Sequence, residues 1–212
     1  MPRRSCRLAF CFALAVLAAP ASAETAKPPA AATAIDGFRD AHFGMTEAEL
    51  RRAIQADFPK AAVAIAINPT EKTTILSLTA GGLLPDTGPA RISYILGYRS
   101  KRLIQVNIVW ISSGSAASDA AVVGSANTLR DYFSARKFEP ASVLRNQNLR
   151  DGAILVFRGS DKDGRMVLLV LSGRTAAERR GKKPPPALLM LQLSYIADSA
   201  RPDIFKIRKG QF

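Results

Sequence analysis

Residues 43–59 read FGMTEAELRRAIQADFP, and this stretch specifies the best-defined local structure of the chain. Thr46 and Glu49 form the Thr-x-x-Glu pattern of a capping box, in which each side chain accepts a hydrogen bond from a free backbone amide at a helix start. Pro59 ends the pattern, because proline cannot continue a helix. Between them, apolar residues recur every four positions: Leu50, Ile54 and Phe58. The stretch therefore predicts a short amphipathic helix over 46–58 that docks on the rest of the fold.

Alternating apolar residues predict strands on both sides of this helix. A strand over 38–43 precedes it, with Gly44 as the bend. Strands over 63–67 and 73–79 follow it, and the first of these is expected to bury one face. The strongest β signal is a hairpin over 92–110, because alternate residues of both strands are apolar. Tyr94, Tyr98 and Trp110 share its apolar face, where we expect core packing; a stacking surface for a ligand is the alternative. The other face of this hairpin is more polar and carries Ser93, Gln105 and Asn107.

The second half of the chain repeats this order of elements. Ser118 is expected to cap a second helix over 119–137, which presents one apolar face: Val122, Ala126, Leu129 and Phe133. Four strands are expected after it, over 143–147, 153–158, 166–171 and 188–196. Asp161-Lys162-Asp163-Gly164 is interpreted as a hairpin turn. The alternating tail, residues 202–212, is expected to add an edge strand.

These elements predict an α+β fold, with antiparallel sheet and two helices on one face. The order of one helix and about four strands occurs twice, over 35–115 and 116–212. We interpret this as two tandem helix-plus-meander halves that together form one compact unit, with the hairpins 92–110 and 153–171 as equivalents. The sheet face opposite the helices would then be open, and an open face is available to partners.

The first 23 residues have the features of an export signal. Arg3, Arg4 and Arg7 precede an apolar run, Leu8 to Ala19, that is too short to span a membrane. An Ala-x-Ala cleavage site ends at Ala23. We therefore expect a periplasmic or secreted protein that begins at Glu24, with a disordered linker over 24–34 and no transmembrane segment. Both cysteines, Cys6 and Cys11, would be removed with the signal.

The chain is strongly basic. It carries 30 Lys+Arg and 17 Asp+Glu, a net charge of +13. Without residues 1–23 it would keep 27 Lys+Arg against 17 acids, a net charge of +10. Such a charge attracts anionic lipids, acidic glycans or acidic proteins. Nucleic acid is not expected as a partner, because the protein is expected to be exported. A basic, solvated surface without a specific partner is the alternative explanation.

The segment 174–186 concentrates this charge between prolines. Its cations are Arg174, Arg179, Arg180, Lys182 and Lys183, and Arg165 is expected nearby in the fold. Guanidinium and ammonium groups of this kind bind phosphates and carboxylates. We therefore expect these five residues to form an anion-binding or partner-binding site. A solvated loop without a function is the alternative.

The sequence offers little for catalysis or metal binding. His42 is the single histidine, and no nucleophile motif accompanies it. One histidine and no cysteine after residue 11 exclude the usual zinc ligand sets. The acid that would close a calcium loop beginning at Asp161 is replaced by Ser172. We therefore expect no catalytic residue, no metal and no cofactor.

The run Phe-Gly-Met-Thr-x-x-Glu-Leu-x-x-x-Ile at 43–54, followed by Tyr-x-Leu-x-Tyr at 94–98, resembles a broad group of small exported bacterial envelope proteins. The helix-plus-meander order, given twice, is also similar to β-lactamase inhibitor proteins and to outer-membrane assembly lipoproteins. The chain lacks the disulfide cysteines of the former and the lipidation cysteine of the latter, so no functional residue is carried over.

Together these observations predict a non-enzymatic exported binding or envelope-accessory protein. Its ligand would be an anionic envelope component or a partner protein, reached through the basic segment or the open sheet face. Two alternatives remain: an inhibitor of a periplasmic or extracellular hydrolase, and a hydrolase whose carboxylates cannot be grouped from sequence. The oligomeric state does not follow from the sequence.

Overall fold

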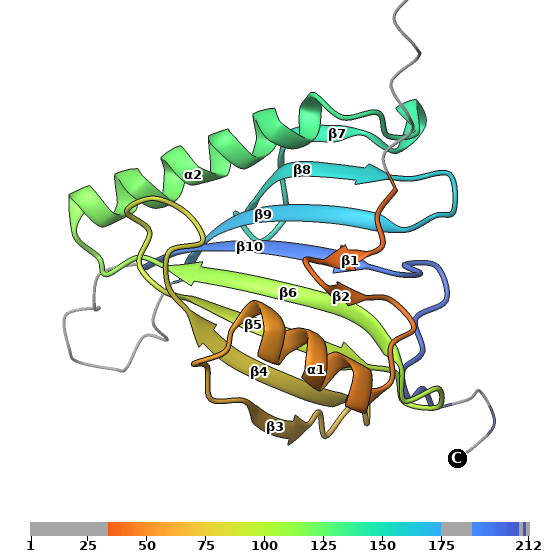
Figure 1. The fold of residues 1–212 in the computed structure, drawn as a ribbon. Helices are drawn as coiled ribbons and strands as arrows, with labels where there is room; N and C mark the ends of the chain where they lie inside the picture. The colour runs from red at the N-terminus through yellow and green to blue at the C-terminus, as the bar shows by residue number, and fades with distance from the viewer. Residues whose placement is uncertain (1–33, 175–187, 208–209, 211–212) are drawn as a thin grey trace, which may run out of the picture. The chain divides into compact units, whose positions relative to one another are not determined.

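The computed structural model describes residues 34–174, 188–207 and 210. In this part of the chain two helices, α1 (Glu47–Asp57) and α2 (Ala116–Ser134), accompany a two-stranded hairpin and an eight-stranded sheet (Figure 1). The hairpin consists of β1 (Gly37–Phe38) and β2 (Ala41–His42). The large sheet consists of β3 (Ala64–Ile67), β4 (Thr74–Ala80), β5 (Ala90–Leu96), β6 (Leu103–Ile111), β7 (Leu144–Asn148), β8 (Ile154–Ser160), β9 (Met166–Arg174) and β10 (Leu188–Ile196).

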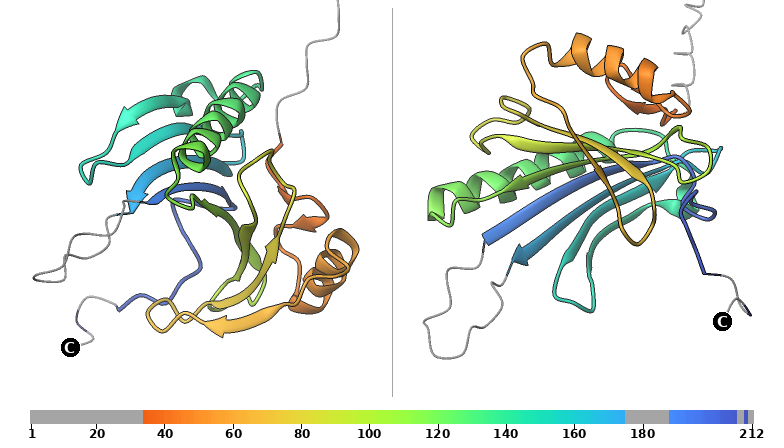
Figure 2. Two further views of the ribbon diagram at one scale, coloured as in Figure 1. Left: turned by 90° about the vertical axis from the view of Figure 1, so that its left-hand side faces the viewer. Right: turned by 90° about the horizontal axis from the view of Figure 1, so that it is seen from below.

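The large sheet is antiparallel throughout and has the strand order β3-β4-β5-β6-β10-β9-β8-β7. Each helix is followed by a four-stranded meander, and the two meanders join where β6 pairs with β10. Both helices lie on the same face of the sheet (Figures 1 and 2). The predicted α+β class, with helices on one face of an antiparallel sheet, is therefore confirmed.

The equivalence that we expected between the hairpins 92–110 and 153–171 is wrong. In the strand order, β5–β6 occupies the place of β9–β10, and β8–β9 occupies the place of β4–β5. The error arises from turn length. A tight turn joins β8 to β9 just as one joins β5 to β6, whereas β9 and β10 are separated by residues 175–187.

The start of α1 forms as predicted. The Thr46 hydroxyl accepts a hydrogen bond from the Glu49 amide at 3.4 Å, and the Glu49 carboxylate accepts one from the Thr46 amide at 2.8 Å. The Thr46 amide and the Thr46 hydroxyl both donate to the Glu49 carboxylate, and these two hydrogen bonds lower the pKa of Glu49. Leu50 and Ile54 are buried, and Phe58 packs partly against the same core. The apolar stripe therefore faces the sheet.

Removing this cap should weaken the fold by a measurable amount. We expect Thr46→Ala to lower the free energy of unfolding by about 1 kcal/mol, because the Glu49 amide loses the Thr46 hydroxyl as its acceptor and the Glu49 carboxylate loses the hydroxyl as a donor. Urea unfolding followed by circular dichroism measures the change. Thr70→Ala is the matched control, since Thr70 is exposed in the β3–β4 turn. Equal stability of the two variants would contradict the role given to the cap.

The segment predicted as one strand over 38–43 is instead the β1–β2 hairpin. The chain turns at Arg39 and Asp40, and the Asp40 amide donates to the Asp57 carboxylate at 3.2 Å. Gly37 permits the turn, because a Cβ atom there would lie 1.9 Å from the Ala41 carbonyl oxygen. The contact of Asp40 with α1 and the close approach of Gly37 to Ala41 therefore produce a hairpin where the sequence pattern predicts one continuous strand.

Helix α2 begins three residues earlier than predicted. Ser115, not Ser118, is the N-cap, and its hydroxyl accepts from the Ser118 amide at 3.2 Å. The Ser118 hydroxyl accepts from the Ser113 amide instead. The helix ends at Ser134, before the predicted 137. Its predicted inner face is largely confirmed, because Val122, Ala126 and Phe133 are buried.

The core lies between the helices and one face of the sheet. It includes Tyr94 and Trp110, as predicted, and an aromatic cluster in which Phe157 contacts Phe133 and Phe138. Tyr98 lies outside it, in the β5–β6 turn, with its ring 5.5 Å from that of Phe205. The core is therefore largely aromatic beside α2, and under α1 it is mainly aliphatic apart from Tyr94.

Two predictions about the ends of the sheet are wrong. The strand over 63–67 does not bury a face: Ile65 is 53% exposed and Ile67 is 68% exposed, because β3 is the last strand of the sheet. The described part of the tail, residues 202–207, is not a strand. It contacts the β5–β6 turn and the β3–β4 turn instead. The Asp203 carboxylate accepts from the Arg99 and Ser100 amides, and the Phe205 amide donates to the Glu71 carbonyl.

Candidate functional site

The sheet face that points away from the helices is the candidate functional site, and we call it the open face. No described helix covers it, and the sheet bows toward the helices, so the open face lies inside the curve (Figure 2). Alternation along the strands assigns its residues. On the four central strands these are Arg91, Ser93 and Ile95; Gln105, Asn107, Val109 and Ile111; Met190, Gln192, Ser194 and Ile196; and Met166, Leu168, Val170 and Ser172.

A row of small polar side chains crosses the middle of the open face. The strand register places Ser77, Ser93, Asn107 and Ser194 side by side on β4, β5, β6 and β10. Gln105 donates to the Asn107 side chain at 2.8 Å, and Gln192 donates to the Ser194 hydroxyl at 3.0 Å. These bonds hold the glutamines along the strands. Ser77 and Ser194 are buried, whereas Ser93, Asn107 and the two glutamines are partly exposed.

The charge of the open face has one sign. None of the residues in β3–β10 is Asp or Glu, whereas Arg91 and Arg158 belong to the open face. Arg91 is exposed. Arg158 is half-buried beside Leu168, and its Nε is buried with no hydrogen-bond partner among the described residues. A guanidinium group held in this way favours a carboxylate or another oxygen acceptor.

The predicted basic site lies largely outside the described residues. Arg179, Arg180, Lys182 and Lys183 fall within 175–187, and of Arg174 the structure describes only the backbone, at the end of β9. Arg165, which was expected nearby, lies before β9, at the other end of that strand from Arg174, and its side chain donates to the Ile35 carbonyl.

Sequence reasoning found part of the open face and missed the rest. Ser93, Gln105 and Asn107 were expected on a polar face. Gln192 and Ser194 were missed because the apolar run 188–196 conceals them, and Arg158 was missed because it is the single charge in β8. These residues share one sequence signal: each lies next to a buried residue in its own strand, so its side chain belongs to the opposite face of the sheet.

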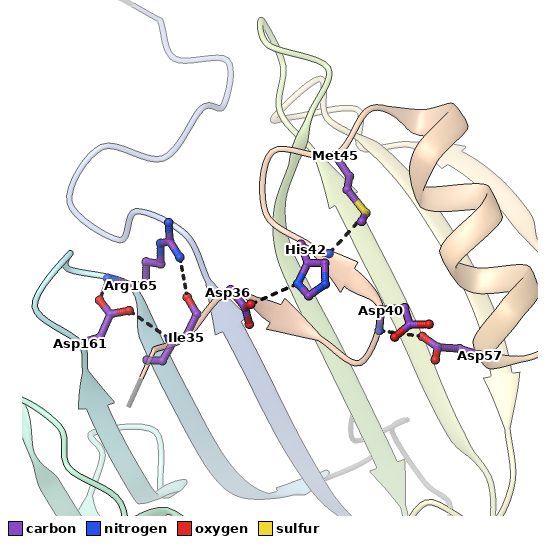
Figure 3. A network of polar contacts seen from close by, with 8 residues as sticks. All are labelled: Ile35, Asp36, Asp40, His42, Met45, Asp57, Asp161 and Arg165. Carbon is purple, nitrogen blue, oxygen red and sulfur yellow. Dashed lines mark hydrogen bonds and ion pairs between the residues drawn. The ribbon is translucent and has the colours of Figure 1, made fainter. Parts of the chain in front are cut away.

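The cluster of acids around His42 is the other candidate site (Figure 3). The Asp36 carboxylate lies 3.2 Å from His42 Nδ1, and both side chains are largely exposed. The pKa of Asp57 is raised by burial, which outweighs the hydrogen bond from Asp40. Among the described residues no hydroxyl is hydrogen-bonded to His42, and no group of three potential metal-ligating side chains occurs. The cluster therefore has a base but no nucleophile.

Asp161 and Arg165 bind the N-terminal segment to the rest of the fold (Figure 3). The buried Asp161 carboxylate accepts from the amides of Ile35, Asp163 and Arg165 at 2.9–3.1 Å. Arg165 donates back to the Ile35 carbonyl at 3.2 Å. The predicted hairpin turn is confirmed, since the Gly164 amide donates to the Asp161 carbonyl. Asp161 thus has a structural role.

Within the described residues, neither helix has the length and apolar character needed to cross a bilayer. Comparison with family models, with curated proteins and with solved structures finds no match to this chain. The function must therefore be argued from the open face itself.

Proposed function

We propose that this chain is a non-enzymatic, exported binding protein whose open face binds an acidic partner protein. The acid-free open face carries the proposal: arginines and hydrogen-bonding amides and hydroxyls face outward without an opposing charge. Arg158 supports it most directly, because its partly buried guanidinium has a buried, unpartnered Nε. A carboxylate from a partner would bind the accessible part of this guanidinium group.

The size of the open face fits a protein better than a small molecule. Eight strands spaced about 4.8 Å apart, with about seven residues each, give a surface on the order of 800 Å². That is about the area that each partner contributes to a standard protein–protein interface. Within the part of the chain that the structure describes, cavities of about 270, 330 and 430 Å³ each lie beside a helix end.

The two alternatives, an inhibitor of a hydrolase and a hydrolase, differ in the part of the surface that they require. An inhibitor of a hydrolase would use the open face in the same way, so it is a special case in which the partner is an enzyme. A hydrolase would need the acids near His42 to act on a substrate. Nothing in the geometry of that cluster supplies the nucleophile, so the binding proposal is preferred.

Charge reversal on the open face tests the proposal. We expect Arg91→Glu combined with Arg158→Gln to reduce the partner retained from envelope extract at least about tenfold, because carboxylates of the partner lose both guanidinium groups. The matched control is Arg52→Glu, an exposed arginine on α1. Capture by the unaltered protein should also fall steeply as salt is raised. Circular dichroism verifies that each variant is folded.

A second variant separates the open face from the basic segment. Arg179, Arg180, Lys182 and Lys183 are all replaced by serine. If this variant loses the partner while the open-face variant keeps it, the basic segment is the binding site and the proposal is overturned. If the unaltered protein retains no acidic protein at low salt, the proposal is also overturned.

A further inference from the structure

The two edges of the large sheet are built differently. The β7 edge has the sequence LRNQN, and its ladder with β8 skips Asn146, whose φ is +50°. Polar residues and an interrupted ladder are devices that keep other strands from adding to an edge. The β3 edge, AIAI, has no charge, no proline and no interruption in its pairing with β4. One edge is protected and the other is not.

The unpaired hydrogen-bonding groups of β3 belong to its isoleucines. The Asn68 amide donates to the Thr73 carbonyl, so Asn68 and Thr73 form a hydrogen-bonded pair with β4. In an antiparallel ladder such pairs alternate, so Ala66 and Ala64 also point their amides at β4. The amides and carbonyls of Ile65 and Ile67 therefore point outward from this edge, with which no described strand pairs.

The sequence of this edge is symmetric about Ile65. Residues 63–67 read VAIAI, so a β-branched residue lies two positions to each side of Ile65 and an alanine one position to each side. Ile65 pairs with the fully buried Leu76, so the isoleucines lie on the helix side of the sheet. A two-fold axis through Ile65 would place Val63 of one copy opposite Ile67 of the other.

We propose that β3 pairs with β3 of a second copy of this chain, antiparallel and centred on Ile65. The contact is isologous, as a two-fold dimer requires. Each outward amide of Ile65 and Ile67 gains a backbone acceptor, and the exposed isoleucines cover one another on the helix side. In this register Thr70 of one copy would lie across from Lys60 of the other, and the neighbouring Glu71 and Lys72 carry opposite charges, so the turn adds no net charge there.

Sedimentation equilibrium of the purified protein, expressed from the full 212-residue sequence, tests the pairing. We expect a reversible dimer with twice the mass of the chain. Ile65→Lys should raise the dissociation constant at least about tenfold, because two like charges then oppose each other at the axis. Gln147→Lys adds the same charge to the β7 edge and should leave the dissociation constant unchanged. Both positions are exposed, so folding is preserved.

Cysteine substitution tests the register. At the axis the two Cα atoms of position 65 would lie about 5.5 Å apart, within disulfide reach, whereas those of position 67 would lie about 14 Å apart. Ile65→Cys should therefore cross-link under mild oxidation, and Ile67→Cys should not, as read by peptide mass mapping. A monomer at all concentrations, open-ended aggregates, equal weakening by Gln147→Lys, or cross-linking through position 67 instead would overturn the proposal.

Discussion

Replacement of Phe157 by alanine should lower the free energy of unfolding by about 3–5 kcal/mol. Phe157 is completely buried, and its ring stacks on Phe133 at 5.6 Å and contacts Phe138 at 5.3 Å. Gly159 has no side chain and so leaves space for these rings, since a Cβ atom there would lie 2.8 Å from Phe138. The truncation removes aromatic contact between β8 and α2 and leaves a cavity that a sheet cannot close.

The loss should appear as a fall in Tm of about 6–20 °C for a domain of this size. Differential scanning calorimetry measures it. Tyr132→Ala is the matched control, because Tyr132 also contacts Phe133 but is 50% exposed. We expect that variant to lose less than about 1 kcal/mol. A similar loss in both variants would show that the aromatic cluster is not the packing centre of the second half.

Replacement of Asp161 by alanine should cost about 2–3 kcal/mol. Asp161 is 6% exposed, and its carboxylate is the acceptor for the amides of Ile35, Asp163 and Arg165. A buried amide without an acceptor costs about 1–3 kcal/mol, and water can reach only some of these three. The Ile35 amide should also exchange its hydrogen faster, because the N-terminal segment loses its attachment to the β8–β9 turn.

Hydrogen exchange followed by NMR, together with urea unfolding, separates the local effect from the global one. Asp163→Ala is the control, since Asp163 is exposed in the same turn and contributes its backbone amide. We expect its stability to change by less than about 0.5 kcal/mol. Unchanged exchange at Ile35 in the Asp161 variant would contradict the attachment.

The elements that sequence predicted well are those determined by near neighbours. The cap of α1 depends on Thr46 and Glu49, three positions apart, and it formed as expected. The bounds of β10, 188–196, were predicted correctly because the run is strongly apolar and is flanked by residues that favour turns or loops. The turn at Asp161–Gly164 likewise depends on its own four residues.

The features that sequence did not predict depend on distant contacts. The N-terminal hairpin forms where the Asp40 amide meets Asp57, and no pattern in 38–43 encodes that meeting. The exposure of Ile65 follows from the position of β3 at the end of the sheet, which alternation alone cannot reveal. For the candidate site, alternation found half of the polar row, but placing Ser194 beside Asn107 required the register of β6 with β10.

The junction between β6 and β10 has a consequence for the order of folding. Strands β3 to β6 pair with neighbours in sequence, so the first meander can assemble early, whereas the pairing of Ile108 with Leu193 closes a long loop. Until β10 arrives, β6 is an apolar edge strand with unpaired backbone groups, a state prone to aggregation. We therefore expect the pairing of β6 with β10 to be the slow step in folding and to end the period in which the chain is prone to aggregate.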